Sequence, residues 1–389
     1  MIYMIKKTPK SKPKPKLKPK GVPKRKIGKA SRVKKGRKKS TKKTELTKAE
    51  LNPIIFPVKE NDWESWQTFN PAAILLKDSE KLRGKADRIH FLYRAIGPDG
   101  ISRLGYANSL DGLKINERLS YSVYEHRRGH FILNFYSFAS GGSFGGAEDP
   151  RLVRVGEEKT LYMTYTACDE GLRVGLTSIK VKDFLNKNWK WKPAVLISPP
   201  GQTHKNWVIF PDKIKGKYAI LHSINPQVGV AYFDNLEFDG ETHIQSDYNG
   251  KCEPQSGCAW ESYMRGVGAP PIKTKYGWLV FYHALEKNDS GKYKAGAMLL
   301  DLNNPTKILY RSKKPILEPD EAYENEGFKP GIVYISGAVV KDGKLLIYYG
   351  GADSYVNLAY ADLEEFLQNL AQNQKPKWKG INRKIKAPK

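Results

Sequence analysis

The segment Gly145–Arg151, with the sequence GGAEDPR, holds the residues of this chain whose types and spacing are best suited to chemistry. It sets two carboxylates, Glu148 and Asp149, beside Arg151, and it adds glycines that let backbone approach a ligand and a proline that fixes the local geometry. A carboxyl next to an arginine suits the cleavage of a glycosidic bond, in which one group carries or relays a proton and another holds hydroxyls or an anion. The same residues could also form an acidic turn that pairs with its own arginine.

Five other segments share one pattern, in which a charged or glycine-containing turn leads into an aromatic-rich apolar stretch with a small or polar end. Their starts are 57 to 72 residues apart, and each interval has room for a four-stranded antiparallel unit. Helical patterning is scarce, and Asp362–Gln372 is the best helix candidate. We therefore predict an all-β fold, a five-bladed β-propeller, with a two-sheet sandwich as the alternative. The five predicted strands are Arg88–Gly97, Thr160–Cys168, Lys217–Ile224, Gly277–Leu285 and Lys344–Gly351.

In a propeller, polar residues at corresponding ends of the inner strands meet around one axis. That arrangement would bring Arg94, His283 and Asp353 together with Asp149. A site drawn in this way from distant segments would explain why no compact motif holds all of the chemistry.

The net charge of +27 is concentrated near the N-terminus of the 389-residue chain. Residues 1–43 contain 20 Lys and Arg and no Asp or Glu, which leaves +7 for the remainder. Such a segment cannot offset its ordering entropy, so we predict a disordered basic tail over residues 1–47, a propeller domain over 48–372 and a second basic tail over 373–389. The first tail could make weak non-specific contact with nucleic acid or another anion, or it could act only as a solvated tail.

Other features of the composition point to a cytoplasmic protein without a membrane partner. Met1–Ile5 is too short for the core of a signal peptide, and no apolar stretch approaches the ~18 residues that would span a bilayer. Cys168, Cys252 and Cys258 give no even disulfide framework, and the spacing of the last two is not that of a usual zinc pair. The Asp and His residues are scattered rather than at metal-ligand spacing, so we expect no metal and no cofactor.

A series of short motifs follows in order along the chain: Asn52–Ile54, Trp63–Ser65, Phe69–Ala72, Leu92–Gly97, Ser102–Ala107, Glu148–Arg151, Phe210–Ile214, Gly268–Ile272, Gly277–His283 and Gly350–Asp353. Over most of residues 52–365 the chain thereby resembles glycoside hydrolase family 130. The resemblance implies a five-bladed propeller that cleaves β-mannosides with inversion, either by phosphorolysis or by hydrolysis. The basic tail has no counterpart in the family pattern.

The resemblance also implies roles for individual residues. Asp149 matches the catalytic acid, whose proton passes to the glycosidic oxygen through a hydroxyl of the mannose rather than directly. Asn70, Arg94 and Asp353 match positions that hold the sugar, and we place Arg151 of the signature with them as substrate-binding. By residue type, Asn70 supplies donors and acceptors, Arg94 a rigid fork of donors, and Asp353 acceptors for paired hydroxyls. Asn70 could instead cap a turn, and Arg94 could pair with a structural carboxylate.

A phosphorylase of this family needs a cationic pocket, because a phosphate dianion is costly to desolvate unless charge-assisted bonds replace its water. His283 and Tyr293 match the histidine and tyrosine of that pocket. Lys205 stands where an arginine is usual, and Ser223 replaces a second arginine and removes its charge. Lys329 could restore that charge from another loop.

An inverting hydrolase instead needs a second carboxylate to activate water, about 6.5–9.5 Å from the acid. Glu261 is the candidate base in that case, and otherwise an ordinary edge-strand glutamate. The retained Lys205, His283 and Tyr293 favour phosphorolysis to mannose 1-phosphate, with inorganic phosphate as the co-substrate, and the alternative is an inverting β-mannosidase.

Two non-enzymatic functions compete with these. A carbohydrate-binding propeller would have no need of the acid Asp149, and a nucleic-acid-associated protein would rest on the tail alone. Tryptophan and tyrosine suit stacking on sugar faces, although most of them fall in strand patterns, and Trp63, Trp66 and Trp260 are the best candidates for such stacking. Members of the family are often multimeric, which leaves an oligomer open.

Overall fold

The computed structural model describes residues 46–77, 87–126, 141–168, 171–246 and 259–372. All described residues belong to one compact unit. The two predicted tails therefore lie outside the described residues, apart from Leu46 and Thr47. Thr47 already belongs to a strand, which pairs with a strand near the C-terminus.

Strands dominate the described part, which confirms the all-β class. A few short helices accompany them: the 3₁₀ turns η1 (Asp62–Glu64) and η3 (Ala259–Glu261), and the helices α2 (Val181–Leu185), α3 (Ala322–Asn325) and α4 (Leu363–Ala371). The strands are β1 (Thr47–Lys48), β2 (Gln67–Leu76), β3 (Arg88–Ile96), β4 (Ile101–Ser109), β5 (Glu117–Arg118), β6 (Gly145–Arg154), β7 (Thr160–Cys168), β8 (Leu172–Lys180), β9 (Val195–Leu196), β10 (Val208–Ile209), β11 (Tyr218–Ser223), β12 (Gly229–Phe233), β13 (Tyr263–Val267), β14 (Ile272–Thr274), β15 (Gly277–Glu286), β16 (Asp289–Leu300), β17 (Ile308–Arg311), β18 (Val333–Lys341), β19 (Lys344–Gly351) and β20 (Tyr355–Asp362).

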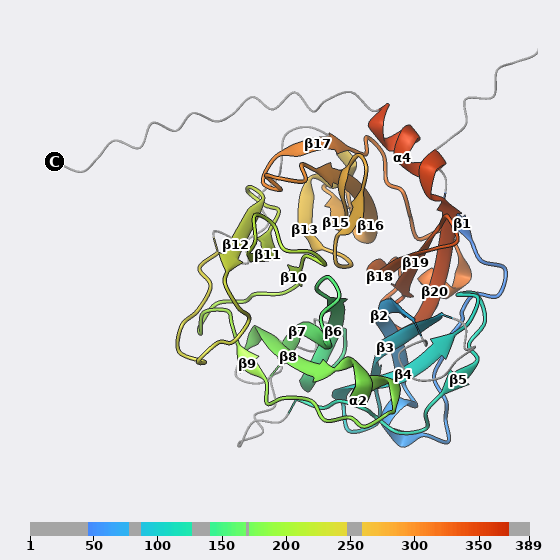
Figure 1. Ribbon diagram of the computed structural model, residues 1–389. Coiled ribbons are helices and arrows are strands. Elements are labelled where there is room, and N and C mark those ends of the chain that lie inside the picture. Colours follow the sequence, from blue (N-terminus) through green and yellow to red (C-terminus); the bar gives the residue numbers. More distant parts are fainter. Residues whose placement is uncertain (1–45, 78–86, 127–140, 169–170, 247–258, 373–389) are drawn as a thin grey trace, which may run out of the picture. The chain divides into compact units, whose positions relative to one another are not determined.

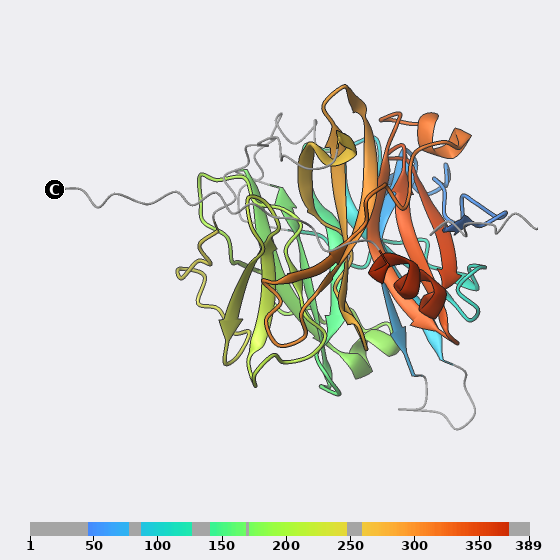
Figure 2. The same ribbon diagram turned by 90° about the horizontal axis from the view of Figure 1, so that it is seen from above.

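The five predicted strands are confirmed as β3, β7, β11, β15 and β19, and each lies between two antiparallel partners. The resulting groups are β2-β3-β4, β6-β7-β8, β10-β11-β12, β13-β15-β16 and β18-β19-β20. The first two groups join into one sheet, because β4 and β6 pair in parallel over two residues. Figure 1 shows the groups side by side around a common centre, with β2, β6, β10 and β18 toward it, and Figure 2 shows their strands running through the thickness of this body.

Hydrophobic packing follows the same order. Each of five buried clusters fills the space between two successive groups, and one of them joins the first group to the last. Ile89 and Phe91 of β3, for example, share a cluster with Leu346 and Tyr348 of β19. Because a central strand is covered on both faces, it reads as a nearly continuous apolar run rather than as an alternating one.

One aromatic position recurs in every group. The sixth residue of each predicted strand is a buried or half-buried ring, and in four groups a glycine on the following strand faces it. A Cβ at Gly105 would lie 2.3 Å from the Tyr93 ring, and a Cβ at Gly296 would lie 2.5 Å from the Tyr282 ring. The recurrence indicates five copies of one structural unit. The rings are Tyr93, Tyr165, His222, Tyr282 and Tyr349, and the glycines are Gly105, Gly175, Gly229 and Gly296.

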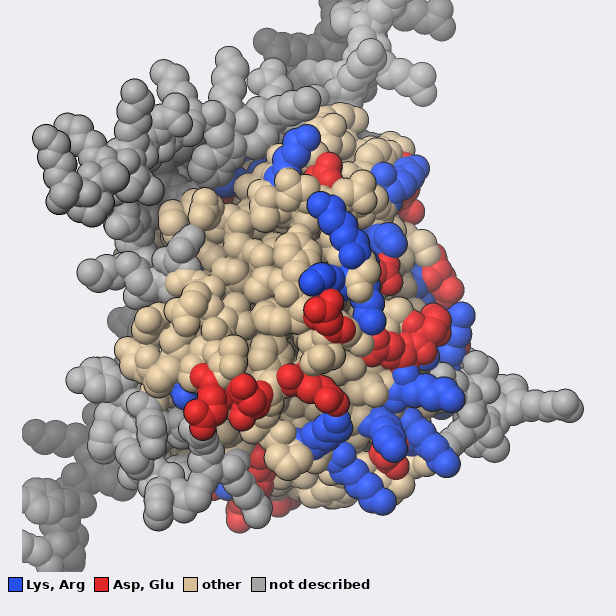
Figure 3. Space-filling model, turned by 60° about the vertical axis from the view of Figure 1, so that its left-hand side comes forward, with Lys and Arg blue, Asp and Glu red and all other residues tan. Residues whose placement is uncertain are grey.

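The predicted helix is confirmed as α4. The Asp362 side chain caps its first turn by accepting a hydrogen bond from the Glu365 amide, and Gln372 ends it. Its buried face packs against the cluster between the fourth and fifth groups. Among the described residues, no helix is long and apolar enough to cross a membrane. On the face shown in Figure 3, lysines and arginines lie interspersed with acidic side chains.

Candidate active site

Three predicted site residues stand on backbone that is out of the regular strand geometry. Asn70 lies in β2 and Asp149 in β6, each at a point where the pairing register shifts, and Asp353 follows β19. All three have positive φ values, of 45°, 48° and 48°. A left-handed conformation is costly for a residue with a side chain, and bulges re-aim side chains next to active sites. The segment around Asp149 is therefore a bulged strand, and its interpretation as an acidic turn is wrong.

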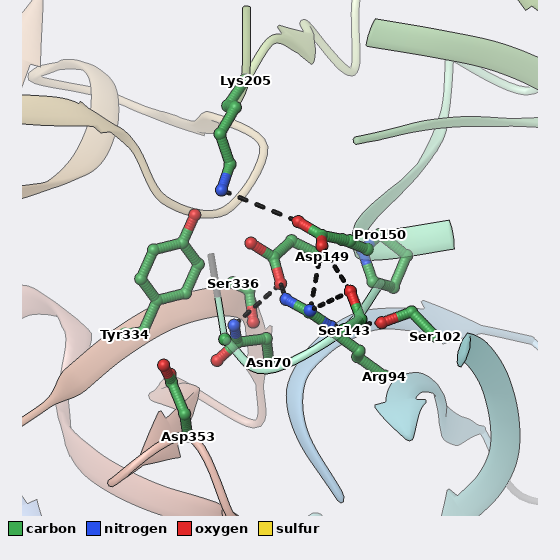
Figure 4. Close-up of polar contacts among 12 residues, drawn as sticks. Asn70, Arg94, Ser102, Ser143, Asp149, Pro150, Lys205, Tyr334, Ser336 and Asp353 are labelled. Atoms are coloured by element: carbon green, nitrogen blue, oxygen red, sulfur yellow. Dashed lines mark hydrogen bonds and ion pairs between the residues drawn. The ribbon is translucent and has the colours of Figure 1, made fainter. Parts of the chain in front are cut away.

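Arg94 connects these residues at the bottom of the site (Figure 4). Its guanidinium is fully buried and donates to Asp149 Oδ1 at 3.2 Å and to Glu148 Oε1 at 3.0 Å. It also donates to the hydroxyls of Ser102 and Ser143. Arg94 thus fixes the side chains of both carboxylates.

Asn70 holds Asp149 from the other side. Its Nδ2 donates to Asp149 Oδ1 at 2.8 Å, while its own Oδ1 is buried and has no hydrogen-bond partner among the described residues. A Cβ at Gly350 would lie 2.0 Å from that Oδ1, so only glycine allows the two strands to come this close. A buried acceptor without a partner is costly in a finished core, but it suits a site that receives a hydroxyl donor.

The pKa values of Asp149 and Asp353 are shifted in opposite directions. Burial alone would raise the pKa of Asp149, but the positive charges of Arg94, Lys205 and Arg151 and the hydrogen bond from Asn70 outweigh burial and lower it to about 2. At Asp353, by contrast, burial dominates and raises the pKa to about 6 against the opposing charges of Lys329 and Arg94. Lys329, expected to restore charge to a phosphate pocket, therefore acts on Asp353.

Arg151, which was expected to bind the substrate, contacts other groups of the protein. Its guanidinium donates to the backbone carbonyls of Asp149, Pro150 and Gly268 and to the side chains of Asn206 and Tyr334. Each of its nitrogens thus has an acceptor within the protein, which makes Arg151 a residue that holds the β6 bulge rather than one that binds a sugar. It also does not pair with the carboxylate of Asp149, whose arginine partner is Arg94.

Lys205 stands on the opposite side of Asp149 from Asn70 (Figure 4). Its Nζ lies 3.7 Å from Glu148 Oε2, and about a quarter of its side chain is exposed. The next residue, Asn206, has a φ of 64° and accepts a hydrogen bond from the Tyr334 hydroxyl. The loop before β10 therefore brings a positive charge to the acid.

His283 lies in a stack of rings beside this lysine loop. The Tyr334 ring is parallel to it at 4.1 Å between centroids, and the Tyr293 ring is 5.7 Å away. Burial, assisted by the charge of Arg151, lowers the pKa of His283 to about 3, so the ring is neutral. Neither ring nitrogen makes a hydrogen bond with a described residue; the Ile335 backbone opposes the lowering of the pKa only weakly and does not meet hydrogen-bond geometry. A neutral ring can still donate one N–H to a ligand.

Glu261 is part of a closed cluster. It is buried, accepts a hydrogen bond from the Tyr282 hydroxyl at 2.6 Å and forms an ion pair with Arg311, while Trp260 stacks on Tyr282. The first group contains the same arrangement: Glu64 accepts from Tyr93 and Arg118, and Trp63 stacks on Tyr93. This repetition makes Glu261 a structural residue, in place of the candidate base. The two clusters also occupy Trp63 and Trp260, so of the three candidate stacking residues only Trp66 is largely exposed, at 55%.

Sequence reasoning missed several groups that the structure brings to the site. Glu148 and Ser143 bind Arg94, and Tyr334 and Asn206 bind Arg151. Only Glu148 carried a signal, as the neighbour of Asp149 in the EDPR motif.

The comparisons with known proteins agree with this geometry. A sequence profile of glycoside hydrolase family 130, described as β-1,4-mannooligosaccharide phosphorylase, matches residues 45–372. A 1,2-β-oligomannan phosphorylase from a Thermoanaerobacter species is 35% identical over 80% of this chain and 96% of its own length. A β-1,2-mannobiose phosphorylase from the same organism is 32% identical over 82% and 98%. The structure of a Listeria innocua β-1,2-mannobiose phosphorylase, at 24% identity, shares the fold with a TM-score of 0.62 over 84% of this chain and 99% of its own. This chain belongs to glycoside hydrolase family 130.

Proposed function

We propose that this chain is an inverting β-mannoside phosphorylase on a five-bladed β-propeller, with inorganic phosphate as its co-substrate and no other cofactor. Five groups of strands support the blade count, together with five clusters between them, one of which joins the last group to the first. The relatives named as phosphorylases of β-1,2-linked mannosides make that linkage the first to test.

The placement of Asp149 between two kinds of surface carries this proposal. On one side lie Asn70, with an acceptor free of partners, and the carboxyl of Asp353, which suit the hydroxyls of a mannose. On the other side lie Lys205 and the unpartnered nitrogens of His283, which suit a phosphate. A sugar in the first position would present its C1 to an anion in the second.

In the proposed reaction one bond to C1 breaks, another forms, and a proton passes to the leaving oxygen. Asp149, protonated, gives its proton to the glycosidic oxygen through a mannose hydroxyl, and the bond between that oxygen and C1 breaks. A phosphate oxygen forms the new bond to C1 from the opposite face, which inverts the anomeric configuration. The hydrogen phosphate returns its proton to Asp149, so the products are mannose 1-phosphate and the shortened mannoside.

The low pKa of Asp149 leaves this acid ionised at neutral pH in the absence of ligands. Bound phosphate would counteract this low pKa. The cations that lower the pKa include Lys205 and Arg151, next to the proposed phosphate position. A dianion bound there offsets their charge and raises the pKa of Asp149. Binding of the co-substrate thereby favours the protonated acid that the reaction needs.

The test is to incubate the protein with β-1,2- and β-1,4-linked manno-oligosaccharides, with and without inorganic phosphate. We expect mannose 1-phosphate that appears only with phosphate, and no turnover by Asp149→Asn. Free mannose released equally well without phosphate would overturn the proposal and identify a β-mannosidase of the same family.

A further inference from the structure

Four inner strands share one irregularity. The pairing register shifts between Phe69 and Ala72 in β2, between Glu148 and Arg151 in β6, between Met264 and Gly266 in β13, and between Ile335 and Gly337 in β18. A bulge of this kind releases the residues inside it from the ladder and turns their side chains. The released residues include Asn70, Asp149, Arg265 and Ser336.

Two of these four bulge residues, Asn70 and Asp149, are already part of the site, and Ser336 donates a hydrogen bond to the carbonyl of Pro71, next to Asn70. Asn70, Asp149 and Ser336 appear together in Figure 4. Arg265, the fourth, holds the corresponding position in β13, between Met264 and Gly266. The recurrence of the bulge therefore assigns Arg265 to the same end of its sheet as the reacting residues.

A small pocket, partly open to solvent, lies where Arg265 stands. One wall comes from β11 and the loop before β10, with Lys205, Asn206 and Ser223, and the other from β13, with Met264, Arg265 and Gly266. The two walls pack closely, since a Cβ at Gly266 would lie 2.7 Å from Asn206 Nδ2. Arg265 and Lys205 thus line one space.

Two residues that line this pocket, Lys205 and Asn206, also contact residues of the candidate active site. Lys205 reaches Glu148 at 3.7 Å, and Asn206 bonds to Tyr334, whose ring stacks on His283. Ser223 adds no charge, and its hydroxyl already contacts the backbone carbonyls of Asn225 and Gln227. A dianion held here needs more than one positive charge, because Lys205 shares its charge with Glu148.

We infer that Arg265 is a second phosphate-binding residue, which supplies from the β13 bulge the positive charge that Ser223 on the opposite wall does not carry. This inference rests on the proposed phosphorolysis. A guanidinium offers a planar fork that matches two phosphate oxygens, so the arginine supplies geometry as well as charge. The acid and the anion site would then be built in the same way, each on the bulge of an inner strand.

The first experiment replaces Arg265 by glutamine and by lysine and measures initial rates. With saturating mannoside, we expect Arg265→Gln to raise the KM for phosphate by about tenfold or more, as for loss of a charged hydrogen bond, while the KM for the mannoside changes much less. Arg265→Lys should fall between the glutamine variant and the parent, because it keeps the charge and loses the fork. Lys273→Ala, on β14 of the same sheet, removes one exposed positive charge and should leave both constants unchanged.

The second experiment moves the charge across the cavity. Ser223→Arg, added to Arg265→Gln, should lower the KM for phosphate again, because both positions line the same space. Thermal unfolding of every variant identifies any that fail to fold. Calorimetric binding of inorganic phosphate to Asp149→Asn, with and without Arg265→Gln, gives the same comparison in the absence of turnover.

The outcomes separate this inference from the function on which it rests. Phosphorolysis by the parent with an unchanged KM for phosphate in Arg265→Gln overturns the role of Arg265 and leaves the function standing. A parent that neither uses nor binds phosphate overturns both. A weaker affinity for phosphate that Ser223→Arg restores supports the inference.

Discussion

Buried carboxylates lie next to an arginine in two kinds of cluster in this molecule, and the two kinds differ in how completely their polar atoms are satisfied. In the Glu261 cluster, Tyr282 and Arg311 bind the carboxylate in a regular setting that the Glu64 cluster repeats. In the Asp149 cluster, the backbone is strained, Asn70 Oδ1 has no hydrogen-bond partner in the described part of the chain, and a lysine approaches from a partly open pocket. A carboxylate–arginine pair is therefore not in itself a sign of chemistry; strain and unsatisfied neighbours are what distinguish the reactive cluster.

The largest expected effect is a loss of activity that occurs in the Asp149 cluster and not in the Glu261 cluster. Asp149→Asn should lower kcat by about 10²–10⁴-fold, the range for loss of a general acid, because an amide cannot donate the proton. Arg94 keeps Glu148 as a counterion in this variant, so the loss of stability should be small. Steady-state rates and thermal unfolding of the same preparation check both parts, and a variant that keeps the parent's kcat would contradict the role of Asp149.

Glu261→Gln should show the opposite pattern. Removal of its charge breaks the ion pair that the buried Glu261 forms with Arg311, and breaking a buried pair typically costs about 3–5 kcal/mol in the free energy of unfolding. Glu64→Gln is the matched control, since it leaves Arg118 in the same situation. Denaturant unfolding measures the loss, and the kcat of each folded variant should stay near that of the parent. A loss of kcat in Glu261→Gln alone would restore its role as a base.

The aromatic–glycine contact that accompanies each cluster gives a smaller effect. Gly105→Ala would push a methyl group into the Tyr93 ring, and Gly296→Ala would do so at Tyr282. Overpacking of this kind costs about 1–3 kcal/mol. Gly291→Ala, at a position with nothing within 4 Å, is the control and should be nearly neutral. Equal stabilities for all three variants would argue against the repeated unit.

An effect of comparable size concerns the pH dependence of stability. Burial raises the pKa of Asp353 from an ordinary 3.8 to about 6, so the folded protein keeps a proton that the unfolded chain releases between these values. Its contribution to stability is therefore complete below about pH 4 and is lost as the pH rises through about 6. The free energy of unfolding of the parent relative to Asp353→Asn should fall by about 2–3 kcal/mol over that range. A difference that does not change with pH would show that Asp353 is not shifted.

Much of the fold was predictable because it depends on repeated local patterns. The five central strands read directly from apolar runs between turns, and Asp362 and Gln372 mark the ends of α4. The contact between Tyr93 and Gly105 was not predictable from the spacing of the predicted strands, because it depends on the pairing register of two strands.

The site was predictable in part. Asn70, Arg94 and Asp149 are together as the family pattern implied. The roles of Arg151 and Glu261 were not predictable, because an arginine or a glutamate in a strand looks the same in sequence whether its partner is a ligand or the protein. Arg265 was missed for a related reason: a bulge arises from the pairing of β13 with β15, and no residue type in β13 announces it.

The most direct test of the account follows the oxygen that attaches to C1. The protein is incubated with β-1,2-mannobiose and inorganic phosphate in ¹⁸O-labelled water, and the products are analysed by mass spectrometry. The account predicts mannose 1-phosphate without ¹⁸O, because the phosphate oxygen attacks C1. Free mannose that carries ¹⁸O at C1 from the first turnover, in place of mannose 1-phosphate, would contradict it.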